Sequence, residues 1–110
     1  MQPEDRVRIR HLVDAAVTAG QFIEGRERGD LGTDEMLRLA LTKLVEIVGE
    51  AAKQVTEEGR AELPDVPWAA AARTRDRLVH HYFDIDLDVL WATVTEDLPM
   101  LLSMLPNPDA

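Results

Sequence analysis

The longest periodic stripe of apolar residues in the sequence begins at Leu37, ends at Val55 and follows a glycine-rich loop at 25–32. Its members recur at three- and four-residue steps: Leu37, Leu41, Leu44, Val48, Ala51, Ala52 and Val55. This spacing is typical of a helix with one apolar face. Thr33 is a suitable N-cap for that helix, and the pattern extends to about Glu58. A helix of this length predicts the spine of a helical bundle.

Three further helices are predicted, and no strand. One covers about 3–23, and another opens at Pro67 and includes 68–81. The last follows Asp86, a suitable N-cap, and Pro99 should kink or divide it. The fold class is therefore all-α, with four to five helices in an antiparallel bundle.

Length and composition favour one cytoplasmic domain over residues 1–110, with a frayed tail at 106–110. The chain has 110 residues, of which 45% are hydrophobic, so a packed core is expected. It has no cysteine, which excludes disulfides and thiolate zinc sites. No apolar run approaches the roughly 20 residues that span a bilayer, so no membrane association is expected. The charged start is unlike a secretory signal.

The formal net charge of −9 opposes binding to nucleic acid through broad neutralisation of phosphates. Any contact with RNA therefore needs a local focus of positive charge. Arg73, Arg75 and Arg77 lie within one short stretch that is followed by His80 and His81. This stretch is the predicted focus.

Arg75 and His80 supply the two functions that RNA cleavage without a metal ion requires. The planar guanidinium of arginine holds a phosphate through two hydrogen bonds and stabilises its negative charge in the transition state. Histidine accepts and donates a proton near neutral pH, which assists attack by the ribose 2′-oxygen. The expected products are a 2′,3′-cyclic phosphate and a free 5′-hydroxyl. No metal or cofactor is expected.

The positions of these residues on an ideal helix favour a site that two copies share. Arg75 and His80 would be separated by about 140° around the axis and about 7.5 Å along it. Asp76 would share a face with His80 and orient its ring, and Arg75 would share a face with Tyr82. A site containing both Arg75 and His80 closes more easily across a homodimer interface.

The ordered motifs of the chain resemble the HEPN superfamily, and within it the HepT-like proteins of prokaryotic toxin–antitoxin pairs. Arg75 and His80 match the R-x4-6-H signature, inside the longer pattern Arg-Asp-x-Leu-Val-His-x-Tyr-x-x-Ile-Asp-Leu-x-x-x-Trp. Ile47-Val-Gly-Glu-Ala-Ala52, Leu63-Pro-Asp-Val-Pro-Trp68 and Asp97-Leu-Pro99 match other parts of that family in the expected order.

The resemblance implies a homodimeric, metal-independent endoribonuclease toxin with Arg75 and His80 as catalytic residues and Asp76 as the adjacent polar residue. It also implies a cognate nucleotidyltransferase antitoxin of the MNT type, and Tyr82 matches the tyrosine to which such a partner attaches AMP in some family members. Such a modification would add negative charge and bulk beside the arginine. Arg73 and Arg77 are the candidate RNA-binding residues. Many relatives have Gly-Met where this chain has Arg73-Thr74, and this change adds charge and volume near the cleft.

Two other functions are compatible with the same sequence. The chain could be a catalytically silent HEPN dimer that binds a toxic nucleotidyltransferase as its partner or antitoxin, or a purely structural helical dimer. Asp84, Asp86 and Asp88 resemble the start of a calcium loop, but that loop needs glycine at its sixth position and glutamate at its twelfth. Capping and surface charge explain these aspartates better.

Two less distinctive features remain. Glu46 and Glu50 are one helical turn apart and form either polar contacts within the bundle or a carboxylate pair. We expect Glu50 to point toward the motif helix. His11 is expected on the surface or in a groove.

Overall fold

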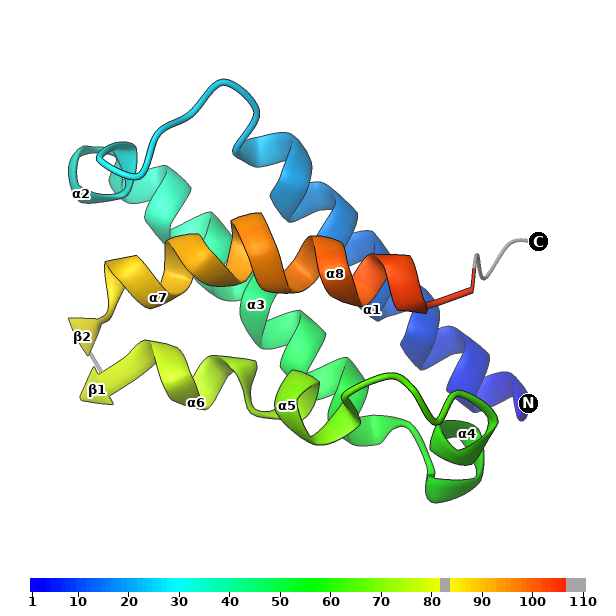
Figure 1. The fold of residues 1–110 in the computed structure, drawn as a ribbon. Helices are drawn as coiled ribbons and strands as arrows, with labels where there is room; N and C mark the ends of the chain where they lie inside the picture. Colours follow the sequence, from blue (N-terminus) through cyan, green and yellow to red (C-terminus); the bar gives the residue numbers. More distant parts are fainter. Residues whose placement is uncertain (82–83, 107–110) are drawn as a thin grey trace.

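The computed structural model describes residues 1–81 and 84–106, with His80 and His81 described by their backbone. The described residues fold as helical passes that run in alternating directions, as Figure 1 shows, and this confirms the all-α class. The elements in chain order are α1 (Pro3–Phe22), α2 (Asp30–Thr33), α3 (Glu35–Gln54), α4 (Glu57–Glu62), α5 (Trp68–Ala72), α6 (Thr74–Leu78), β1 (Val79–His81), β2 (Asp84–Ile85), α7 (Leu87–Ala92), the π-helical turn η1 (Thr93–Asp97) and α8 (Leu98–Met104).

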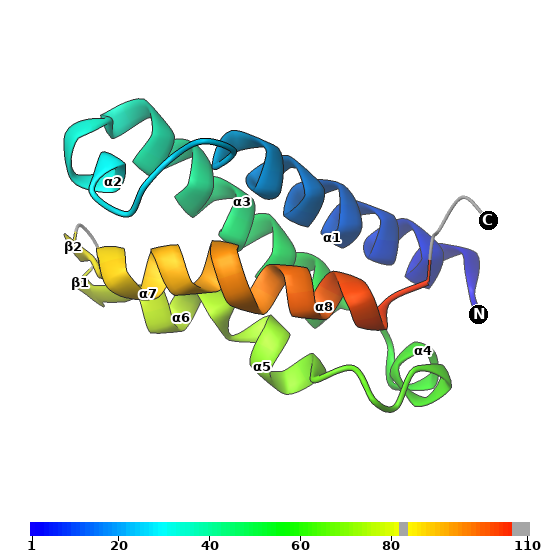
Figure 2. The same cartoon turned by 45° about the horizontal axis from the view of Figure 1, so that its top comes forward.

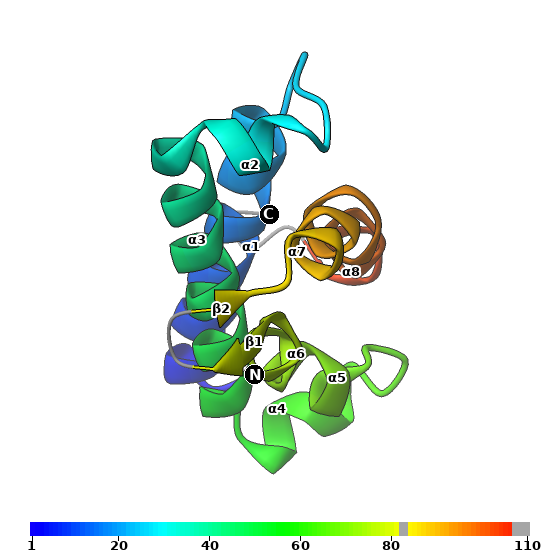
Figure 3. The ribbon, with the colours of Figure 1, turned by 90° about the vertical axis from the view of Figure 1, so that its left-hand side faces the viewer.

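The long helices α1 and α3 pack along their length and form the framework of the molecule. Their apolar stripes meet in a core whose innermost side chains are inaccessible to solvent, among them Leu12, Leu41, Val45 and Val48. The end view in Figure 3 places α1 and α3 on one side, with α5–α6 and α7–α8 as separate columns on the other. In Figure 2 the α7–α8 column runs across the front of the framework. The site therefore forms where the shorter helices meet α3.

The helix predicted to reach about Glu58 ends at Gln54, and a separate helix, α4, follows it. Thr56 causes the break, because its backbone is extended and its hydroxyl accepts a hydrogen bond from Gly59 N at 3.1 Å as the N-cap of α4. Asp5 on α1 accepts hydrogen bonds from both Thr56 N (2.9 Å) and Thr56 Oγ1 (2.6 Å). These two bonds hold the pKa of the buried Asp5 carboxyl below its usual value.

The start of α3 also differs from the prediction. Asp34, and not Thr33, is its N-cap, with Oδ1 accepting a hydrogen bond from Leu37 N at 3.0 Å. Thr33 instead ends the short helix α2, which begins at Asp30 inside the predicted loop at 25–32. Leu31 explains this helix, because its side chain is fully buried in the core and the backbone must fold back to place it there.

The last helical pass matches its predicted boundaries closely. Asp86 is the N-cap of α7, and its Oδ1 accepts from Val89 N at 3.1 Å. The predicted division at Pro99 is also present, since η1 precedes α8 and Pro99 lies in the first turn of α8. Helix α8 ends at Met104, and residues 107–110 of the predicted tail lie outside the described residues.

The single helix predicted through 68–81 is wrong. It is broken at Arg73, between α5 and α6, and it ends at Leu78. Val79 and the two histidines form β1, which pairs antiparallel with β2, so a short strand pair replaces the expected last helical turn. Asp86 N donates to Leu78 O at 2.7 Å and closes the base of this turn. No helix in residues 1–81 or 84–106 is both long and apolar enough to cross a membrane.

Candidate functional site

A close approach between α3 and the α5–α6 junction places the motif arginine. A Cβ atom added to Gly49 would lie 3.2 Å from Thr74 Oγ1 and 3.4 Å from Ala72 O, so glycine permits the contact. The Thr74 side chain is buried there, and its hydroxyl donates to Ala71 O at 3.0 Å. Thr74 therefore contributes its volume to the packing against α3, and the next residue, Arg75, projects outward.

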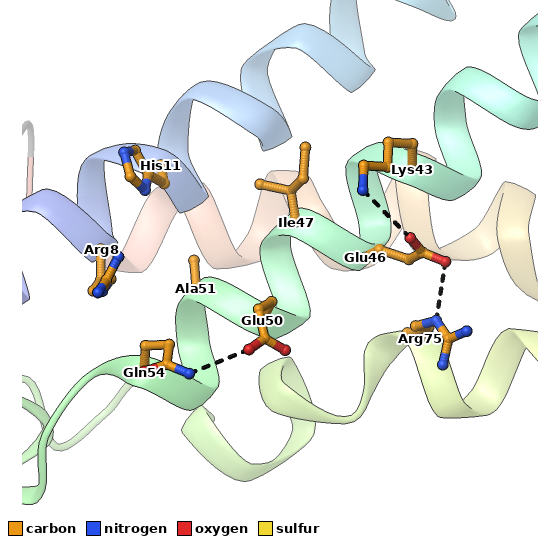
Figure 4. A pocket seen from close by; sticks show the side chains of 9 residues that line it. All are labelled: Arg8, His11, Lys43, Glu46, Ile47, Glu50, Ala51, Gln54 and Arg75. Atoms are coloured by element: carbon orange, nitrogen blue, oxygen red, sulfur yellow. Dashed lines mark hydrogen bonds and ion pairs between the residues drawn. The ribbon is translucent and has the colours of Figure 1, made fainter.

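Glu46 of α3 holds the Arg75 side chain by one edge. Arg75 Nε donates to Glu46 Oε1 at 3.0 Å, and Lys43 Nζ lies 3.9 Å from Glu46 Oε2 (Figure 4). The Arg75 side chain is 54% exposed, and its two terminal nitrogens point away from Glu46 in Figure 4. Because a guanidinium binds a phosphate through a pair of N–H groups, this arrangement leaves the terminal pair directed toward solvent.

The sequence indicated the wrong carboxylate for this contact. Glu50, which we expected to point toward the motif helix, accepts a hydrogen bond from Gln54 Nε2 at 3.2 Å on its own helix. Glu46 makes the contact with Arg75 because it lies one turn earlier on α3, level with α6. The only signal in the sequence was the spacing of the two glutamates, which does not say which turn of α3 the motif helix would meet.

The predicted single focus of arginines is divided between two sides of α6. Arg77 Nη2 pairs with Asp97 Oδ2 of η1 at 3.2 Å, next to α8, whereas Arg75 faces Glu46 of α3. The division follows from the helix, because residues two apart point in nearly opposite directions. Arg73 is exposed at the break between α5 and α6. Arg75 and Arg77 are therefore held on different sides of α6 by different carboxylates.

The structure changes the expected relation between Asp76 and His80. Asp76 is exposed on α6, but His80 lies in β1 after the helix has ended, so the two do not share a helical face. The shared helical face on which we expected Asp76 to orient the His80 ring is therefore absent. His80 follows Leu78, the last residue of α6, by two positions, and its backbone lies in the turn closed by the bond between Asp86 and Leu78. Tyr82 lies outside the described residues.

The other aspartates of this region have structural roles. Asp86 caps α7, as expected from the sequence, and Asp88 Oδ1 accepts from Arg28 Nε at 2.7 Å. Within the described ranges, no three histidine, aspartate or glutamate side chains gather in the manner of metal ligands.

Arg75 lies between two hollows of the surface. The first, which we call the α1–α3 hollow, has a volume of about 460 Å³ and is lined by Arg8, His11, Lys43, Glu46, Ile47, Glu50, Ala51, Gln54 and Arg75. The second, the hairpin-side hollow, has a volume of about 360 Å³ and includes Leu39, Val79 and Ile85 beside Arg75. His11 was expected on the surface or in a groove, and it is an exposed residue of the first hollow. Arg8 and Lys43 were missed because they lie far from the motif in sequence.

The comparisons with known proteins agree on one family. The sequence profile of the family described as "Ribonuclease HepT-like" matches residues 12–107. "Probable ribonuclease HepT" of Thermococcus cleftensis is 42% identical over 72 residues, which cover 66% of this chain and 66% of that protein. "Putative RNase MJ1380" of Methanocaldococcus jannaschii is 31% identical over 90 residues, 82% of this chain and 83% of its own length.

Some relatives are considerably longer than the matched region. "Gamma-glutamylcyclotransferase and putative RNase MJ0434" of Methanocaldococcus jannaschii is 29% identical over 101 residues, which cover 92% of this chain but 46% of that protein. The matched region thus spans just under two thirds of the Thermococcus protein and less than half of this longer Methanocaldococcus protein. No solved structure matches the chain.

Proposed function

Because the chain belongs to the ribonuclease HepT-like family, we propose that it is a metal-independent endoribonuclease with Arg75 and His80 as its catalytic residues. The observation that carries this proposal is the way in which the Arg75 guanidinium is held. Its guanidinium is held through Nε by Glu46, its terminal nitrogens point to solvent, and it lies at the junction of two hollows. A cation held in this way is preorganised for a phosphate.

In the proposed reaction His80 takes the proton of a ribose 2′-hydroxyl, and the 2′-oxygen attacks the adjacent phosphorus. Arg75 binds the phosphate oxygens as negative charge accumulates on them. The bond from phosphorus to the 5′-oxygen breaks, and its electron pair stays on that oxygen, which takes a proton from a protonated histidine or from water. The products are a 2′,3′-cyclic phosphate and a 5′-hydroxyl, and no water is consumed in this step.

The active unit in this proposal is a homodimer in which two copies of the motif segment face each other. The hairpin-side hollow supports it, because the apolar side chains of Val79 and Ile85 are half-buried there and Leu39 is 58% exposed. Exposed apolar groups beside a charged catalytic residue fit an interface that excludes water from the site. We expect the protein to elute and scatter light as a dimer.

We further propose that the protein is the toxin of a pair, silenced by a nucleotidyltransferase of the MNT type that attaches AMP to Tyr82. The support is the sequence motif alone, in which Tyr82 follows His80 by two positions. Added phosphate charge near Arg75 would repel RNA. Intact-mass analysis after co-expression should show added AMP on the wild type and none on Tyr82→Phe. Unmodified wild type in the presence of an active partner would contradict this part of the proposal.

The central experiment compares the wild type with His80→Ala and Arg75→Ala on a labelled RNA, in the presence of EDTA. Each variant should lose about 10²–10⁴-fold in cleavage rate while its helical circular dichroism is unchanged. Arg77→Ala is the matched control, since it removes the same side chain from the same short helix on the opposite side. Cleavage by His80→Ala at the wild-type rate would overturn the assignment, and so would dependence on a divalent metal.

A further inference from the structure

We propose that the α1–α3 hollow is a second phosphate-binding subsite, in which Arg8 and Lys43 hold the RNA backbone beside the phosphate that is cut. This inference rests on the proposed function, because it takes Arg75 as the place of the reacting phosphate. It extends the site from a single phosphate to a strand of several nucleotides. It assigns a role to two cations that lie outside the motif.

Charge on the lining of the hollow supports an anionic ligand. Arg8, Lys43 and Arg75 place three formal positive charges on the lining, on a chain whose formal net charge is −9. Of the two carboxylates of the lining, Glu46 contacts both Arg75 and Lys43, and Glu50 accepts a hydrogen bond from the neutral amide of Gln54, so the three cations outnumber the two carboxylates. Among the residues that the structure describes, no carboxylate lies within ion-pair distance of Arg8. A local positive field of this kind is what an acidic protein needs in order to bind RNA.

The shape of the hollow fits a strand that continues from Arg75. Arg8 and His11 lie on the α1 side, Arg75 on α6, and α3 forms the floor between them, as Figure 4 shows. The floor residues of α3 run from Lys43 to Gln54, which is about 16 Å at about 1.5 Å per residue. Successive phosphates of a stacked strand are separated by about 3.4 Å along its axis. The hollow therefore has room for more than the phosphate at Arg75.

Half-burial distinguishes Arg8 from an ordinary surface cation. Its side chain lies against the framework between α1 and α3, and it has less freedom to lose when it binds a ligand. Arg26, Arg28 and Arg77 are also paired with carboxylates, but they lie elsewhere on the molecule, outside the hollow.

The test compares two RNA substrates, a dinucleoside monophosphate with one phosphate and an octanucleotide of the same cleavage step. Arg8→Ala and Lys43→Ala should each raise KM for the octanucleotide by about three- to tenfold, the change expected for one charge-assisted contact. The rise should be smaller for the dinucleoside monophosphate, which carries only the reacting phosphate. The salt dependence of octanucleotide binding should weaken by about 0.7 in the logarithmic slope for each lost contact.

Lys53→Ala is the matched control, because it removes an exposed lysine from α3 outside the hollow. It should leave both KM values unchanged. An equal effect of Lys53→Ala would mean that net charge alone matters and would overturn the subsite. Equal changes of KM on the two substrates would overturn it as well.

A dimer interface is the competing use of this surface. If Arg8→Ala and Lys43→Ala shift the dimer to monomer in light scattering without altering octanucleotide binding, the hollow is a contact between copies and the subsite is overturned. If the wild type cleaves neither substrate, the proposed function fails. Fluorescence anisotropy with the labelled octanucleotide then still tests the subsite through the same variants, which should bind more weakly than Lys53→Ala.

Discussion

The framework of α1 and α3 and the segment from Arg73 to Ile85 are built on different principles. Each framework helix has 20 residues, and together they contain half of the largest fully buried side chains among the described residues. The segment starts at the break at Arg73 and contains one five-residue helix, α6, and a short strand pair. Its inward side chains, Thr74 and Leu78, are buried against the framework, while Arg75 is half-exposed.

If Arg75 is catalytic, as we propose, stability and chemistry are located on different residues. Burial of apolar side chains stabilises the framework without any need for exposed polar groups. The segment uses a few buried residues to anchor itself and leaves its charged side chains accessible to a ligand. Substitutions in the framework core should therefore change the free energy of unfolding, whereas substitutions of exposed residues in the segment should change the catalytic rate.

The largest expected effect on stability is in the framework core. Leu41→Ala should lower the free energy of unfolding by about 2–5 kcal/mol, because the side chain is fully buried and its removal leaves a cavity. Met36→Ala on the same helix is the control, since Met36 is 83% exposed and should change stability by less than about 0.5 kcal/mol. Urea unfolding followed by circular dichroism measures both. Similar losses in the two variants would break the comparison.

The next effect concerns the polar clamp between α1 and α4. Asp5→Ala should cost about 2–3 kcal/mol, because it leaves the N–H and hydroxyl of Thr56 without their charged acceptor. Asp14→Ala, an exposed carboxylate on the same helix, should cost much less. The two variants are compared by urea unfolding at neutral pH. A loss for Asp14→Ala as large as that for Asp5→Ala would contradict the role of the clamp.

The hydrogen bonds of Asp5 also predict how the stability of the protein depends on pH. The hydrogen bonds from Thr56 lower the pKa of Asp5 in the folded protein. A lowered pKa means that the carboxylate contributes its full stability above the ordinary aspartate pKa of about 3.9. This contribution is lost as the pH falls through the folded value. Asp5→Asn should therefore unfold with less change between pH 6 and pH 3 than the wild type, and an unchanged slope would argue against the clamp.

A smaller effect, on rate and not on stability, is expected where the segment meets the framework. Glu46→Ala should lower kcat by about tenfold, because Arg75 loses the acceptor of its Nε hydrogen and the orientation of its terminal nitrogens. Glu46→Gln keeps an oxygen in that place and should recover part of the rate. Glu50→Ala, one turn further on α3, should change kcat less. Equal kcat values for the alanine and glutamine variants would exclude an orienting role.

The smallest effect is expected for the exposed pair on the far side of α6. Arg77→Ala breaks the contact with Asp97 and should change stability by about 0–1 kcal/mol, as is usual for exposed ion pairs. Its cleavage rate should stay far above that of Arg75→Ala. A loss as large as that of Arg75→Ala would mean that the two arginines act together, contrary to their separation around α6.

The extent of successful prediction differs between the same two regions. The apolar periodicity of 37–55 and the cap at Asp86 were sufficient to predict the long helix α3 and the start of the last helical pass. The path after Leu78 was not predictable in this way. The sequence continues with residues that a helix tolerates, and the bond from Asp86 N to Leu78 O, which closes the turn, involves two residues separated by the whole strand pair. Local patterns contain no information on such a contact.

The helical class, the family and the motif residues could be read from the amino-acid sequence, because periodicity, caps and ordered motifs are local properties. Three relations became visible only in the folded chain: Glu46 holds Arg75, Arg75 and Arg77 face opposite sides of α6, and Arg8 and Lys43 lie beside the motif arginine. These relations depend on the contact permitted at Gly49 and on the level at which α6 meets α3. Tertiary packing sets the contact and the level, and the spacing of residues within one segment contains no information about either.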